Sequence, residues 1–216
     1  LSEIYPSKEP TTQSRSVNIE FSGTGIAYDV VPAYLDRQDV YTIPDRDVDR
    51  WILSNPKVHA ERSTAANERS GKQLNPLVKA VKHANRHHEG GGRSFHLEVL
   101  SWEVLTYEPA NYLAGLIALF EGLRDRMLGP CPDPAGLGPD IGPSMERRAQ
   151  AQRWLKDMAE RSRRAQELMN DGRLGEAHAE LRIVFGPAWP ERGSTARASA
   201  AIITSGSLDH SGSRFG

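Results

Sequence analysis

The sequence predicts an α+β fold in which a short β-rich segment precedes a larger helical region. Three patterns carry this prediction. Apolar residues recur with a period of two in residues 17–21, as in a half-buried strand. From residue 73 onward, apolar residues recur at helical spacing. Residues 129–143 contain five Pro and four Gly, so they interrupt the helical region with a structured loop or linker.

The β-rich segment is predicted to form a hairpin. Residues 22–25, Ser-Gly-Thr-Gly, are typical of a turn, and residues 26–35 form a second β-rich run after them. Residues 47–53 are then predicted as a short helix.

Five longer helices follow in the prediction. In the first of them, apolar residues recur at i, i+3, i+4 and i+7, which indicates one face turned to a core. The second is apolar almost all round and is expected to be buried. The predicted helices are residues 73–88, 95–105, 111–127, 145–170 and 174–185. From residue 192 the chain is rich in Ser, Gly and Ala and is predicted to be disordered.

Composition narrows the class of protein. The 216 residues include 27 Lys and Arg against 28 Asp and Glu, a balance that argues against a protein coating nucleic acid by bulk electrostatics. The longest apolar stretch, residues 112–120, is far shorter than the roughly 20 residues that span a bilayer. A single cysteine, Cys131, excludes an internal disulfide framework and suits a reducing compartment. We therefore expect a cytoplasmic protein without a membrane span.

Asp29 is the first candidate for chemistry, because it lies inside an apolar strand. A carboxylate there is costly unless charge or hydrogen bonds compensate it. Alternation places Asp29 on the face of Ala27 and Val31, and Asn18 or Glu20 of the paired strand could lie beside it. A carboxylate on a strand is a common ligand of Mg²⁺, which prefers hard oxygens. The alternative, an edge-strand aspartate that faces water, stays open.

Three residues of the helical region are candidates for a nucleotide site. Lys82 lies at the margin of an apolar stripe, where its ammonium suits phosphate oxygens. Ser94 follows three glycines and is predicted as a helix N-cap, where a hydroxyl and backbone N–H groups can bind an anion. Phe95 offers an aromatic face for stacking on a nucleobase. The structural alternatives are a solvated lysine, an ordinary N-cap and a core phenylalanine.

A zinc site is a weaker interpretation. His83 and His87 are four residues apart, as two helical zinc ligands are. However, no Glu follows His83, and one cysteine cannot form a thiolate cluster, so the pattern argues against zinc.

Several segments, taken in order, resemble one family. They are residues 17–21, YDVVPA at 28–33, YTIPD at 41–45, Trp51, NPKVH at 55–59, Asn67, LVKAVKHAN at 77–85, SFHLE at 94–98, Asp133-Pro134, Ala177 and FGPAWP at 185–190. Together they resemble the bacterial cGAS/DncV-like nucleotidyltransferases (CD-NTases), and the resemblance covers roughly residues 15–190.

The resemblance implies a partial polymerase-β-like nucleotidyltransferase palm followed by a helical domain. Residues 1–60 would be the C-terminal part of the palm, residues 61–190 the helical domain and residues 191–216 a disordered tail. Such enzymes join nucleoside triphosphates (ATP, and GTP, UTP or CTP) into cyclic di- or trinucleotide second messengers in antiphage (CBASS) signalling. They use two Mg²⁺ ions, for which Mn²⁺ can substitute, in a two-metal displacement at phosphorus.

The same resemblance implies a role for each candidate residue. Asp29 would be the third carboxylate of a metal-binding triad. Lys82 and Ser94 would hold the donor triphosphate, and Phe95 would stack on its base.

The C-terminal tail suggests a partner. In some antiphage operons, relatives carry a flexible tail that an E1/E2-like protein joins covalently to a target. The chain ends at Gly216, and a residue without a side chain suits such an acyl transfer. An inert tail is the alternative.

Two other functions stay open from the sequence. One is a non-catalytic nucleotide-binding or scaffold domain. The other is a nucleotidyltransferase that acts on RNA ends, which the near-neutral charge disfavours. Base choice, product linkage and ring size depend on loop geometry that a sequence does not reveal.

One departure from the family pattern generates a prediction. The family's Gly-Ser turn and Asp-x-Asp pair are expected before Val17, but residues 1–16 contain only Glu3 and Glu9 as acids and begin with Leu rather than Met. We therefore expect the 216-residue chain by itself to bind Mg²⁺–nucleotide poorly and to make little or no product. Incubation with all four nucleoside triphosphates and Mg²⁺ measures this, and rapid formation of a cyclic product would contradict it.

Overall fold

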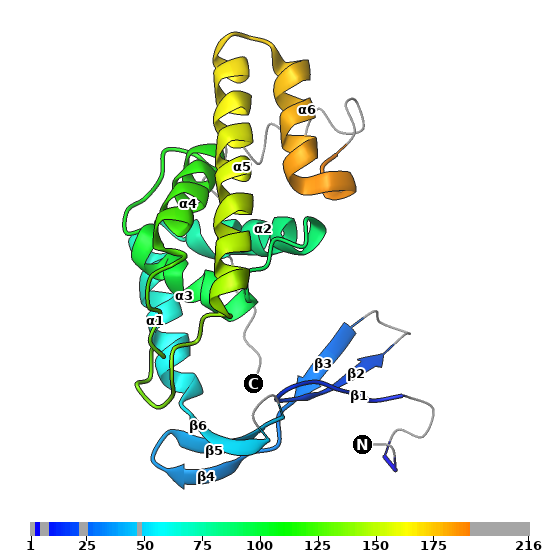
Figure 1. The fold of residues 1–216 in the computed structure, drawn as a ribbon, viewed down its shortest axis with the longest axis vertical. Helices are drawn as coiled ribbons and strands as arrows, with labels where there is room; N and C mark the ends of the chain where they lie inside the picture. Colours follow the sequence, from blue (N-terminus) through cyan, green and yellow to red (C-terminus); the bar gives the residue numbers. More distant parts are fainter. Residues whose placement is uncertain (1–2, 5–8, 22–25, 47–48, 191–216) are drawn as a thin grey trace, which may run out of the picture. The chain divides into compact units, whose positions relative to one another are not determined.

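A computed structural model describes residues 3–4, 9–21, 26–46 and 49–190 of the chain (Figure 1). Its contacts divide the chain into two compact units. The first is Leu1–Arg62 with Pro132–Asp140, and the second is Ser63–Cys131 with Ile141–Gly216. The predicted turn at residues 22–25 and the predicted tail, including Gly216, lie outside the described residues.

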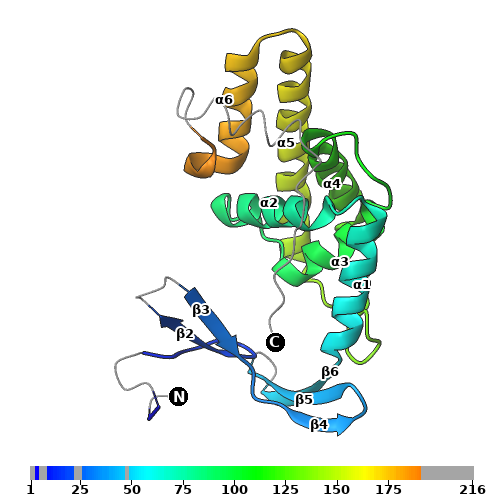
Figure 2. The ribbon, with the colours of Figure 1, turned by 180° about the vertical axis from the view of Figure 1, so that it is seen from behind.

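The described residues of the first unit form two antiparallel sheets of three strands each (Figure 2). One has the order β1-β2-β3 and the other the order β4-β5-β6. Their bounds are β1 Thr11–Thr12, β2 Val17–Phe21, β3 Ile26–Val30, β4 Tyr34–Arg37, β5 Val40–Asp45 and β6 Arg50–Ser54. The pairing of β2 with β3 confirms the predicted hairpin.

Two details of the β-rich prediction are wrong. The run 26–35 is not one strand, because β3 and β4 belong to separate sheets and Pro32, which has no N–H to donate, lies between them. The helix predicted at 47–53 is instead largely β6, in which Ile52 pairs with Ile43 and Trp51 with Pro44. A short apolar run fits a strand as well as a helix, and here the neighbouring strand decides.

An ion pair joins the segment before β2 to the end of β5. The Arg15 guanidinium donates from Nε to Asp45 Oδ2 at 2.9 Å, and its Nη2 lies 2.8 Å from the same oxygen. The Asp45 side chain is only 5% exposed, so the arginine compensates a nearly buried charge. Next to it, the Arg46 N–H donates to the Ser14 carbonyl at 2.9 Å. These bonds hold the two sheets of the first unit together.

Six α-helices and one 3₁₀ helix make up most of the described residues. Their bounds are α1 Pro56–Arg69, α2 Leu74–His87, α3 Ser94–Val104, α4 Tyr112–Arg126, α5 Met145–Asn170, α6 Leu174–Phe185 and η1 Gly186–Ala188. Helices α2 to α6 confirm the five longer helices predicted from spacing. Helix α1 was not predicted, because it is polar and buries only Ala66. Its start is nevertheless typical, since Asn55 Oδ1 accepts from the Val58 N–H at 3.1 Å and Pro56 is the first helical residue.

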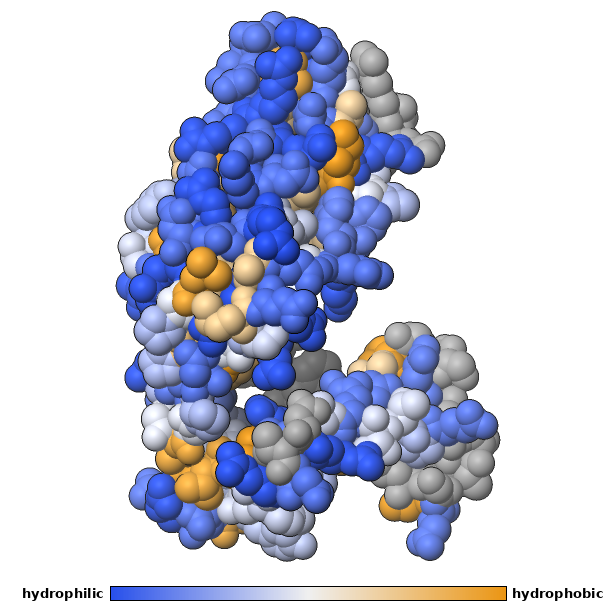
Figure 3. Space-filling model, in the orientation of Figure 1, coloured by the Kyte–Doolittle hydropathy of each residue, from blue (hydrophilic) through white to orange (hydrophobic). Residues whose placement is uncertain are grey.

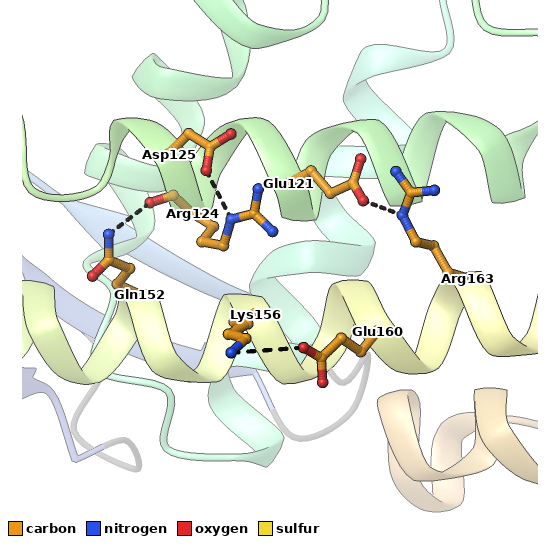
Figure 4. Close-up of polar contacts among 7 residues, drawn as sticks. All are labelled: Glu121, Arg124, Asp125, Gln152, Lys156, Glu160 and Arg163. Atoms are coloured by element: carbon orange, nitrogen blue, oxygen red, sulfur yellow. Dashed lines mark hydrogen bonds and ion pairs between the residues drawn. The ribbon is translucent and has the colours of Figure 1, made fainter.

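Helix α5 packs against both α4 and α6 and organises the core of the second unit. Phe120 of α4 is fully buried and meets Trp154 of α5 edge to face, with ring centroids 5.9 Å apart. Polar contacts flank this core (Figure 4): Arg163 of α5 donates to Glu121 of α4, and Gln152 Nε2 donates to the Arg124 carbonyl at 3.3 Å. Hydrophilic residues cover the face of α5 turned to the viewer in Figure 3.

The Pro- and Gly-rich segment 129–143 contains no helix, as predicted. Within the first unit, Asp133 ties part of this segment to α1. Its Oδ1 lies 3.1 Å from His59 Nε2, and its Oδ2 accepts from the Leu137 N–H at 2.9 Å.

None of the helices in the described ranges is both long enough and apolar enough to cross a membrane.

Truncation of the central aromatic contact should destabilise the second unit. Phe120→Ala removes a fully buried ring and is expected to lower the free energy of unfolding by about 3–5 kcal/mol. Denaturant unfolding followed by helical circular dichroism measures the change. Leu174→Ala on α6 is the control, because this side chain is 63% exposed and its loss should cost less than about 0.5 kcal/mol.

Acid should loosen the segment around Asp133. Burial by itself raises the pKa of this carboxyl group, but hydrogen bonds from the Leu137 N–H, His59 and the Ala135 N–H together hold its pKa below the usual 3.8. A lowered pKa in the folded state stabilises the fold above pH 3.8, and this contribution is lost as the pH falls through the lowered pKa.

Asp133→Asn should therefore reduce hydrogen-exchange protection of the Leu137 amide near pH 7 by about tenfold or more, since the bonded carboxylate is worth about 1–3 kcal/mol. The difference from the unsubstituted chain should shrink below pH 3.8. Equal protection of the two proteins at neutral pH would show that Asp133 does not hold this segment.

Candidate functional site

Asp29 is the fourth of the five residues of β3 and lies directly opposite Asn18 of β2. Asn18 Nδ2 donates to Asp29 Oδ1 at 2.8 Å, so the predicted polar neighbour is present. The two side chains share one face of the sheet, because paired residues of antiparallel strands point to the same side. On the opposite face, Tyr28 pairs with the buried Ile19 and meets the Phe21 ring edge to face at 5.8 Å.

Asp29 is not buried inside the sheet, and the structure fits the alternative of an edge-strand aspartate that faces water. Every residue of β3 is exposed, and Ile19 of β2 is the buried residue of this hairpin. The reason is position in the sheet: β3 is the edge strand in the order β1-β2-β3 within the described residues. An exposed carboxylate carries little desolvation cost, so burial gives no reason for an acid at this place. The remaining reason for interest is its orientation by Asn18.

Lys82 lies on α2 beside the buried stripe that ends in Val81 and Ala84. Its ammonium makes an ion pair with the Glu98 carboxylate of α3. The Lys82 and Glu98 side chains are 23% and 29% exposed, so the pair is half-buried. Lys82 is therefore not the freely solvated lysine of the structural alternative.

Ser94 was predicted as the N-cap of a helix, but it is the first residue of α3. Arg93 occupies the N-cap position in extended backbone and makes no capping hydrogen bond with its side chain. Helix α3 thus begins one residue earlier than predicted, and Ser94 is exposed in its first turn. The backbone N–H groups of a first turn lack intrahelical acceptors and favour an anion.

Phe95 is half-buried and packs against the helical core. Its ring meets Trp102 of the same helix edge to face, with centroids 6.4 Å apart. Phe95 therefore belongs in part to the core, as the structural alternative predicts. Stacking of its ring on a nucleobase stays a prediction.

The ion pair with Glu98 joins Lys82 of α2 to the helix that begins at Ser94. Glu98, which binds Lys82, lies four residues after Ser94 on α3, and positions four apart share a helix face. Lys82, Ser94 and Phe95 belong to the second unit, whereas Asp29 belongs to the first.

Two residues of this region were not singled out from the sequence as candidates. One is Glu98, whose role depends on a partner 16 residues away. The other is Asn85 of α2, which is only 7% exposed and exchanges two hydrogen bonds with the backbone of Gly92. A signal for Asn85 existed, since it continues the apolar stripe four residues after Val81 and a polar residue there needs partners.

His83 of α2 and His88, the residue that follows this helix, contact the end of α6. His83 Nε2 lies 3.2 Å from the Phe185 carbonyl, and His88 Nε2 lies 3.0 Å from the carbonyls of Ile183 and Val184. Carbonyl oxygens accept hydrogen bonds, so these contacts have a structural explanation. Among the described residues, no three His, Cys, Asp or Glu side chains form a group that could hold a metal ion.

Comparison with known proteins gives a family match and a sequence relative. Residues 1–67 match the family described as Second Messenger Oligonucleotide or Dinucleotide Synthetase domain, SMODS. The chain is 27% identical over 206 residues to a cyclic AMP-AMP-AMP synthase from an Acinetobacter species. This alignment covers 90% of the chain and 59% of the relative, so the chain spans about three-fifths of that protein's length.

Solved structures share the fold. A structure of Vibrio cholerae DncV, a cyclic AMP-GMP synthase with a bound linear intermediate, matches with a TM-score of 0.71 and 16% identity, covering 88% of the chain and 56% of DncV. A structure of CdnC from E. coli MS115-1 with ATP matches with a TM-score of 0.69 and 16% identity, covering 88% of the chain and 70% of CdnC. These matches confirm the α+β architecture of a β-hairpin followed by a helical domain.

The expected family thus rests on two findings from sequence, one within residues 1–67 and one along most of the chain. The chain is thus similar to bacterial synthases of cyclic oligonucleotide second messengers, in agreement with the resemblance predicted from its sequence.

Proposed function

We propose that the protein containing this chain is a cyclic oligonucleotide synthase that joins nucleoside triphosphates by nucleotidyl transfer. The observation that carries the proposal is the similarity to a cyclic AMP-AMP-AMP synthase over 206 residues, which includes both the strands and the helices. In this proposal residues 1–60 contribute to the palm and residues 61–190 form the helical domain.

Asp29 is proposed as a metal-binding carboxylate. Mg²⁺ takes hard oxygen ligands and usually binds one or two carboxylates together with substrate phosphates, so the chemistry of Asp29 fits. Asn18 donates to Asp29 Oδ1 and thereby fixes the orientation of the carboxylate. Asp29 Oδ2, on the same exposed strand, can bind a metal ion. When bound, divalent ions would neutralise triphosphate charge and favour attack by a 3′-hydroxyl.

The helical residues are proposed to bind the donor nucleotide. The Lys82 ammonium carries three N–H donors, and Glu98 accepts from it. Phosphate oxygens can take the other donors without breaking the ion pair. Ser94 adds a hydroxyl at the first residue of α3. Phe95, next in sequence, is proposed to stack on the base.

The names of the relatives suggest the substrates. Adenine nucleotides are proposed first, since the sequence relative makes cyclic AMP-AMP-AMP and CdnC was solved with ATP. GTP is a second candidate, because DncV is a cyclic AMP-GMP synthase. We further propose that the protein acts in antiphage signalling in the cytoplasm. A conjugating or regulatory partner is proposed to act on the tail at Gly216. A partner is also suggested by the solved complex of CdnC with a HORMA protein.

Loss of the Asp29 charge tests the proposal. In the full-length protein with ATP, GTP and Mg²⁺, Asp29→Asn should lower the rate of product formation at least about a hundredfold, because metal-held charge stabilises the transition state by several kcal/mol. Asp36→Asn is the matched control, since Asp36 is also an exposed strand carboxylate, and its replacement should leave the rate within about twofold. Chromatography of the nucleotide products measures both rates.

The alternatives give different results in the same assay. A scaffold domain would make no product in either form, and an enzyme acting on RNA ends would extend an added RNA oligonucleotide instead. Product formation at an unchanged rate by Asp29→Asn would contradict the role of this carboxylate.

A further inference from the structure

The side chain of Asn85 anchors the loop between α2 and α3 at Gly92. Asn85 donates from Nδ2 to the Gly92 carbonyl at 2.9 Å, and its Oδ1 accepts from the Gly92 N–H at 3.1 Å. Both backbone polar groups of Gly92 are therefore paired with a single buried amide. Gly92 lies two residues before Ser94, the first residue of α3.

The rest of this loop is equally confined. Gly90, Gly91 and Gly92 are all buried. Gln150 of α5 donates from Nε2 to the Glu89 carbonyl at 2.6 Å. A Cβ on Gly91, whose φ is +86°, would lie 2.9 Å from the Arg147 carbonyl, and backbone cannot yield as a side chain does. The packing thus leaves no space for a Cβ at Gly90 or Gly91 and confines the path of the loop.

Asn85 also stands one helical turn after Lys82 on α2. The loop that it holds leads directly into Ser94, and Glu98 of the same helix binds Lys82. We propose that Asn85 is a positioning residue for the nucleotide site, which by fixing Gly92 sets the start of α3, and with it Ser94, against Lys82. This inference rests on the proposed function, because it assumes that Lys82 and Ser94 bind a triphosphate.

The residue type supports the inference. Asn85 occupies a position of the apolar stripe that includes Leu77, Val78 and Val81, where a leucine would bury more apolar surface. An apolar residue would leave the N–H and carbonyl groups of Gly92 buried without partners. An amide has one donor and one acceptor side and can satisfy both groups at once.

The test measures nucleotide binding apart from stability. In the full-length protein, Asn85→Ala should raise the KM for ATP about tenfold, as expected when a residue behind the binding groups is lost. The change in kcat should be smaller, because Asn85 itself touches no reacting atom.

Ser70→Ala is the control for a general loss of stability. Ser70 is buried at the other end of α2, where its Oγ accepts from the Leu74 N–H at 3.2 Å. It should lower the melting temperature as Asn85→Ala does but leave the KM for ATP unchanged. An equal rise of KM in the two variants would overturn the proposal.

Gly92→Ala perturbs the same contact from the other side. The added Cβ would lie 3.1 Å from Asn85 Oδ1 and 3.0 Å from Leu97 Cδ1, so these two side chains must shift by a few tenths of an ångström. As a single substitution, Gly92→Ala should raise the KM for ATP. In the Asn85→Ala background it should have a smaller effect, since one of the two contacts is gone, and full additivity would contradict the coupling.

Lys82→Ala separates this inference from the proposed function. A raised KM in Lys82→Ala and in Asn85→Ala supports both. A raised KM in Lys82→Ala with an unchanged KM in Asn85→Ala overturns the positioning role alone. An unchanged KM in Lys82→Ala overturns the triphosphate site and the positioning role with it.

Discussion

The buried glycine loop between α2 and α3 is the constraint on which the candidate nucleotide site depends. Asn85 pairs with both backbone groups of Gly92, and α5 closes over the remainder of the loop. Because the path of the loop is confined, α2 and α3 keep a fixed relation at this end. The half-buried ion pair between Lys82 and Glu98 joins the same two helices. The loop and the ion pair therefore both fix Lys82 of α2 relative to the start of α3.

The acidic part of the proposed site is built on a different principle. Asp29 lies on an exposed edge strand, and a cross-strand hydrogen bond from Asn18 orients it. Such an exposed bond adds little to stability but restricts the directions of the carboxylate oxygens. In both units an asparagine amide thus orients the group next to it, at the surface in one case and in the core in the other.

The sequence predicted helices better than it predicted strands and partners. The bounds of α5 and α6 follow from apolar spacing and terminal glycine, proline and polar residues, which are local signals. The residues of β6 were predicted as a helix because local periodicity does not reveal their pairing with β5. Helix α1 was not predicted because it buries so little apolar surface. The candidates Asp29 and Lys82 were found from residue type and position. The exposure of Asp29 and the partner Glu98 were not, because both depend on neighbouring elements that periodicity does not place.

A structure of the full-length protein with Mg²⁺ and a non-hydrolysable ATP analogue tests the central claim most directly. The account predicts a cation on the Asp29 carboxylate, with Lys82 Nζ and Ser94 Oγ about 3 Å from triphosphate oxygens and the Phe95 ring against the base. It also predicts that Asn85 still holds Gly92 in that state. A triphosphate bound away from Lys82 and Ser94, or an Asp29 carboxylate that faces away from the cation, would contradict it.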